Sequence, residues 1–111
     1  MLLARSGVVA QETPRAADVQ LRAFASTVVA IERIRDEVAA ELARPESKTV
    51  ERQAELRAGM KGRIARAIES HGLTPTTFAR FEYLVTTDDA WRAVFERRLA
   101  TAREPAGRPA Q

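Results

Sequence analysis

Three sets of side chains in this sequence have residue types that could carry out catalysis or bind a metal. His71 is the single histidine, Asp88 and Asp89 form an adjacent carboxylate pair, and Glu32 and Arg35 are three residues apart. His71 has no neighbouring carboxylate or cysteine motif, so no metal site is predicted around it. The two aspartates precede an apolar helical pattern, which is more typical of a helix start than of an acid–base pair.

Glu32 and Arg35 have the spacing of an ion pair within one helix. They lie beside an apolar stripe, so the pair is either a partly buried polar contact or, as we favour, a surface pair. The chain has no cysteine, no glycine-rich phosphate loop and no nucleophile elbow. We therefore predict no catalytic residue, no metal ligand and no cofactor.

The composition is that of one small globular domain. The 111 residues are 45% hydrophobic, and 18 basic and 15 acidic residues leave a formal net charge of +3. Charges of both signs suit a solvated helical surface better than a patch dedicated to phosphates, which argues against nucleic-acid binding. No run approaches the roughly 18 apolar residues of a membrane span.

Helical periodicity predicts a long first helix from about Ala17 to Ala43 and a second from near Lys48 to Ser70. The apolar stripe of the first comprises Leu21, Phe24, Val28, Ile31, Ile34, Val38 and Leu42. The stripe of the second comprises Leu56, Met60, Ile64, Ala67 and Ile68.

The expected helix caps follow from the residues that flank these stripes. Asp18 is predicted to cap the first helix and Ser47 the second. Gly72 suits the left-handed position after the second helix, and Thr74 followed by Pro75 is the preferred order for starting a third.

The third and fourth helices are expected to be short. Thr86 or Thr87 is predicted to cap the fourth, with Asp88 and Asp89 in its first turn. Phe78 and Trp91 belong to an aromatic core that joins these two helices; its other expected members are Phe81 and Phe95. No segment alternates with the period of a strand. The predicted fold is all-α: a small helical bundle built on a long antiparallel helical hairpin followed by two shorter helices.

Charges and small residues on the first two helices suggest how they pack. The first leans acidic and the second leans basic, which favours the antiparallel hairpin. Gly62 lies with three alanines on a second face of the second helix: Ala54, Ala58 and Ala65. Small residues permit close helix approach, so this face is either covered within the fold or by another subunit, or it reflects alanine bias alone.

The chain ends are expected to lie outside the domain. Residues 17–103 form the predicted single domain, residues 104–111 a disordered tail, and residues 1–16 a disordered N-terminus or a signal-peptide remnant. Val8 and Ala10 fit the small-residue pattern before a signal peptidase cut, although Arg5 interrupts the apolar run. The interpretation leans toward export, hence a periplasmic or secreted protein, with a cytoplasmic one as the alternative.

Two stretches resemble the bacterial domain of unknown function family 4168. They are residues 24–35, with Glu32 near the middle of an alanine- and isoleucine-rich helix, and residues 67–79 continued by residues 88–92. The family's Tyr-Asn is Phe78-Ala79 here, and its Asp-Pro step is Asp88-Asp89. The resemblance covers residues 17–99 and implies a shared fold and an exported protein, and it brings no activity or cofactor.

Three functions are compatible with these observations. The leading hypothesis is a non-enzymatic helical module of the bacterial envelope or periplasm that acts through a protein partner or as a homo-oligomer. One alternative is a small enzyme of the chorismate mutase type, whose site for a dianionic substrate would use Arg22, Glu32, Arg35, Arg57 and Arg63. The other is a weak nucleic-acid binder that uses scattered arginines, against which the lack of a recognition helix argues.

Overall fold

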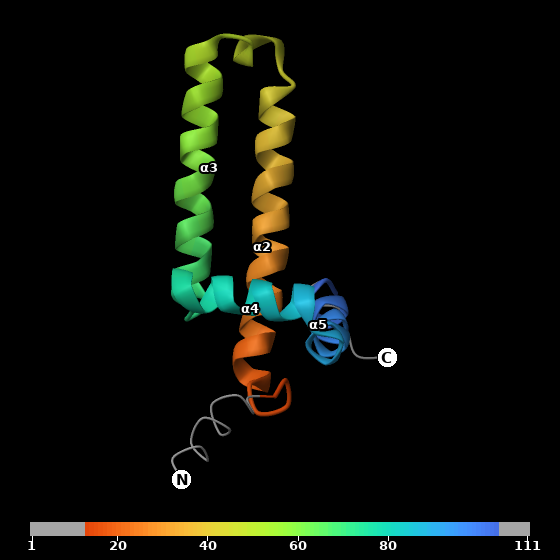
Figure 1. Ribbon diagram of the computed structural model, residues 1–111. Coiled ribbons are helices and arrows are strands. Elements are labelled where there is room, and N and C mark those ends of the chain that lie inside the picture. The colour runs from red at the N-terminus through yellow and green to blue at the C-terminus, as the bar shows by residue number, and fades with distance from the viewer. Residues whose placement is uncertain (1–12, 105–111) are drawn as a thin grey trace.

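The computed structural model describes residues 13–104. Its elements are α2 (Asp18–Leu42), the 3-10 turn η1 (Pro45–Ser47), α3 (Val50–Ser70), α4 (Pro75–Thr87) and α5 (Asp89–Ala102). Figure 1 shows α2 and α3 as a long antiparallel hairpin, with α4 and α5 packed across the first half of α2. No strand occurs in residues 13–104. The predicted fold class is confirmed for this range, whereas the expectations for residues 1–12 and 105–111 fall outside it.

Two parts of the molecule differ in how many helices surround each apolar stripe. We call residues 31–42 of α2 together with residues 50–64 of α3 the arm, and the end where α4 and α5 cross α2 the head (Figure 1). In the head, all four helices contribute to one core. In the arm, α2 and α3 pack mainly against each other within the described chain, and contacts with the head are made at its near end by Ile31, Glu32 and Ile64.

Both caps predicted for the hairpin are wrong. Asp18 is the first helical residue and Ala17 precedes it without a side-chain cap, because the Asp18 carboxylate is engaged by two arginines. Ser47 is buried inside η1, and the backbone N–H of Arg52 donates to Thr49 Oγ1 instead. At each helix start a neighbouring residue takes the cap position: Ala17 in place of Asp18, and Thr49 in place of Ser47. Residue preferences for helix caps do not decide between positions this close in sequence.

The connection from α3 to α4 forms as predicted. Gly72 has a φ of 81°, a backbone conformation that costs glycine little. The N–H of Leu73 donates to the carbonyl of Ile68 over 3.1 Å, and that of Gly72 to Glu69 over 2.9 Å, which is the Schellman pattern. Thr74 then caps α4 by accepting from the N–H of Thr77.

The short link between α4 and α5 is capped by Asp88, so the expected cap at Thr86 or Thr87 is wrong. The Asp88 carboxylate accepts from the N–H groups of Ala90 and Trp91. The hydroxyl groups of Thr86 and Thr87 instead donate to carbonyls of the preceding turn of α4. With these hydroxyls engaged inside α4, the helix continues to Thr87 and only Asp88 is left to cap α5.

The core of the head is organised around Phe24, which is 1% exposed. Its ring centroid lies 5.0 Å from that of Phe78, 5.6 Å from Phe81 and 5.3 Å from Phe95. Such tilted pairs add to the free energy gained by burying the rings. The predicted aromatic core is therefore observed, and a residue of α2 lies at its centre.

Replacing Phe24 should destabilise the whole molecule, because one ring joins α2 to both short helices. Phe24→Ala is expected to lower the free energy of unfolding by about 3–5 kcal/mol, measured by urea denaturation followed by circular dichroism. Tyr83→Ala is the matched control, since Tyr83 is 67% exposed and its loss should change stability by less than about 0.5 kcal/mol. Equal effects of the two substitutions would contradict this description of the core.

Candidate functional site

A groove on one side of the arm is the first candidate site. It has a volume of about 460 Å³ and lies between α2 and α3. Its apolar floor includes Val38, which is buried, and Leu56 and Met60, which are partly buried. The remaining lining residues are Glu37, Ala40, Glu41, Arg44, Glu55, Gly59 and Arg63. The groove thus combines an apolar floor with a charged rim.

Ion pairs across the rim hold the two helices of the arm together. Arg63 of α3 donates to Glu37 of α2, and Arg52 Nη2 lies 4.0 Å from Glu41 Oε1. Acidic residues of α2 thus face basic residues of α3, as expected for the antiparallel hairpin that was predicted from their charges. Each pair is solvent-exposed, so each contributes at most about 1 kcal/mol.

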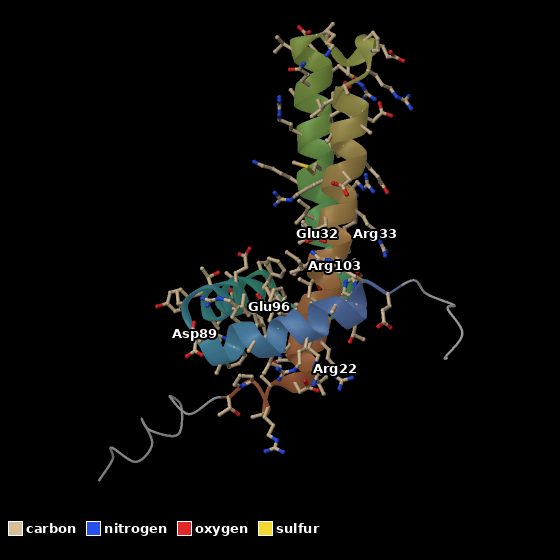
Figure 2. All side chains as sticks on the ribbon, turned by 90° about the vertical axis from the view of Figure 1, so that its right-hand side faces the viewer. Arg22, Glu32, Arg33, Asp89, Glu96 and Arg103 are labelled. Carbon is tan, nitrogen blue, oxygen red and sulfur yellow. The ribbon has the colours of Figure 1, made fainter. Side chains whose placement is uncertain are left out.

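A second hollow, of about 510 Å³, lies on the opposite side of α2 and brings together three of the predicted site residues: Glu32, Arg35 and Phe78. The expected pair between Glu32 and Arg35 does not form. Glu32 Oε2 instead accepts from Arg103 Nη2 over 2.7 Å, and Figure 2 shows these two side chains meeting where the end of α5 reaches α2. Sequence reasoning missed Arg103 because it is 71 residues away from Glu32.

Most of the other predicted site residues lie at helix ends or in the core of the head. Gly72, Thr74 and Asp88 form the helix ends described above, and the Trp91 ring packs 5.8 Å from that of Phe81. Gly62 lies on the outer face of α3, where an added Cβ would meet only Arg66 Nη1, at 3.5 Å. The alanines that share this face are exposed, so the described fold does not cover it; they are Ala54, Ala58 and Ala65.

The five residues of the mutase-type alternative do not converge on one pocket. Glu32 and Arg35 line the second hollow, whereas Arg63 lines the arm groove and pairs with Glu37. Arg22 pairs with Asp18 near the start of α2. Within residues 13–104, no group of three or more histidine, aspartate and glutamate side chains is arranged to hold a metal ion.

Asp18 joins both ends of the described chain. Its Oδ2 accepts from Arg22 Nε and its Oδ1 from Arg98 Nε, each over 2.8 Å. The hydrogen bond from Arg22 is the main reason that the pKa of Asp18 is lowered; desolvation opposes this shift and Arg98 adds to it. The sequence indicated only a cap at this position, because Arg98 is 80 residues away.

No family model, curated protein or solved structure matches this chain. None of the helices within residues 13–104 combines the length and the apolar character that crossing a membrane requires.

The lowered pKa of Asp18 predicts a pH-dependent contribution to stability. In the unfolded chain the carboxyl titrates near its ordinary value of 3.8. The stabilisation is therefore fully present above that pH and is lost as the pH falls through the lower pKa of the folded state. We expect Asp18→Asn to lower the unfolding free energy at neutral pH, and the difference from wild type to vanish in acid.

Urea denaturation at a series of pH values measures this difference. Asp36→Asn is the control, because Asp36 is exposed and makes no ion pair with another described residue. A difference between wild type and Asp18→Asn that stays constant from neutral pH into acid would show that the two arginines do not act through the carboxylate charge.

Proposed function

We propose that this protein is a non-enzymatic helical module that acts through self-association of its arm. The observation that carries the proposal is the poor coverage of α3, in which Ile68 is the single buried residue among 21. In contrast, α2 has eight buried residues. Most helix stability in proteins comes from tertiary packing of an apolar face. A helix this long with so little buried surface therefore indicates that α3 packs against a further partner.

The arm groove is the surface of the arm on which such a partner would bury the most apolar side-chain area. Leu56 and Met60 retain exposure there beside the buried Val38. A pair of helices cannot cover both sides of an apolar stripe, whereas four helices around a shared core can. Two arms packed face to face would produce that arrangement.

Charge complementarity supports a second copy of the chain as the occupant. On the α2 side, the groove rim carries Glu37, Glu41 and Arg44, and on the α3 side it carries Glu55 and Arg63. Each rim therefore offers charges of both signs. A two-fold axis that sets α2 of one copy against α3 of the other can place carboxylates of one copy opposite guanidinium groups of its partner, as the self-complementary surface of an isologous interface requires.

We further propose that the module works in the bacterial envelope or periplasm. Support comes from the pattern of Val8 and Ala10 before Gln11 and from the proposed resemblance to the bacterial domain family 4168. N-terminal sequencing of the native chain tests this placement. A periplasmic chain that starts near Gln11 is expected, and an intact Met1 in the cytosol would refute it.

Sedimentation velocity over a roughly hundredfold range of concentration tests the self-association. The full chain should shift from monomer to dimer as its concentration rises. Met60→Gln should raise the dissociation constant about tenfold or more, because a buried methionine side chain is worth about 1.5–3 kcal/mol relative to an exposed one. Glutamine keeps the length and the helix propensity of methionine.

Val19→Gln is the matched control, because Val19 lies outside the arm and is 82% exposed. It should leave the dissociation constant unchanged. A strict monomer at every concentration would refute the proposal, and so would equal effects of the two substitutions. Circular dichroism of each variant verifies that the helices are retained.

A further inference from the structure

A hollow on the head, away from the arm, is lined mainly by arginines. It has a volume of about 410 Å³ and lies between the start of α2 and the outer edge of α5. Its lining residues are Arg15, Asp18, Val94, Arg97 and Arg98. Figure 2 shows Arg22 on the same stretch of α2, on the other side of α5 from Glu32. Three arginines and one carboxylate therefore line the hollow, and a fourth arginine, Arg22, donates to the same carboxylate.

Asp18 holds two of these arginines in place without using all their donors. Arg22 and Arg98 each donate from Nε to a different oxygen of the carboxylate. Arg98 lines the hollow, and its Nη groups donate to no residue of the described range. The Arg98 and Asp18 side chains are 30% and 28% exposed, so their geometry is constrained by surrounding atoms. Asp18 therefore orients Arg98 and neutralises only part of the local positive charge.

The other two arginines have no side-chain partner among residues 13–104. Arg15 and Arg97 make no side-chain hydrogen bond or ion pair with any residue of the described range. Unpaired guanidinium groups around a hollow repel one another, and an anion would relieve this repulsion. The positive end of the 25-residue helix α2 lies at the same place, and it adds to the attraction for an anion.

We propose that this hollow binds the phosphate group of a small phosphomonoester. Planar guanidinium groups donate paired hydrogen bonds to phosphate oxygens, and Arg15, Arg97 and Arg98 approach the hollow from two elements. The hollow is larger than a phosphate ion, and Val94 supplies an apolar wall for the organic part of the ester. This site does not depend on the proposed self-association of the arm.

Titration of the isotope-labelled full chain, followed by NMR at constant ionic strength, tests the proposal. Phenyl phosphate and inorganic phosphate are the two probes, and they distinguish an ester from the free ion. We expect both to shift the Val94 signals, with tighter binding of phenyl phosphate. Arg97→Gln should weaken binding about tenfold, because it removes a charge-assisted hydrogen bond to phosphate.

Arg57→Gln is the matched control, because it removes the same charge from an exposed position on α3 and should leave the affinity unchanged. Arg97 is exposed and unpaired within the described chain, so its replacement should not disturb folding. Equal weakening by the two substitutions would show general charge attraction and overturn the proposal.

Two further results would also overturn it. Equal affinities for phenyl phosphate and inorganic phosphate would exclude the assignment to an ester. Tight binding of a short oligonucleotide that is insensitive to Arg97→Gln would indicate a polyanion held by the overall positive charge.

Discussion

Phe24 brings α2 against both short helices, because its ring lies 5.0 Å from that of Phe78 on α4 and 5.3 Å from that of Phe95 on α5. This contact places the core at one end of the hairpin. It also determines which charged residues meet, since α5 then crosses α2 where Arg98 can reach Asp18 and the end of α5 can reach Glu32. The head is therefore held by apolar packing at its centre and by ion pairs between α2 and α5 at its surface.

The same arrangement leaves the arm without a third helix. Ile64, Ile68 and Leu73 attach the end of α3 to the core, but α3 before Ile64 has no buried residue. Ion pairs such as that between Arg63 and Glu37 orient the two helices without contributing much free energy. The proposed self-association follows from this imbalance between a well-covered head and a poorly covered arm.

Features that depend on a few adjacent residues could be predicted from the sequence. The helix periodicity, the left-handed Gly72 and the start of α4 at Thr74 belong to this class, because each involves hydrogen bonds within one turn of the chain. The partners of Asp18 and Glu32 could not be predicted in this way, since they are 80 and 71 residues away. Ion-pair partners at such separations are decided by how α5 crosses α2, and that crossing is set by packing of the aromatic core rather than by local pattern.

Amide hydrogen exchange of the full chain as a function of its concentration tests whether the arm is covered by a second copy, because it reports protection for each helix separately. We expect amides of α3 in the arm to become better protected as the concentration rises, while those around Phe24 in the head change little. Protection of the arm that equals that of the head and does not depend on concentration would contradict this expectation, because the two helices would then need no partner.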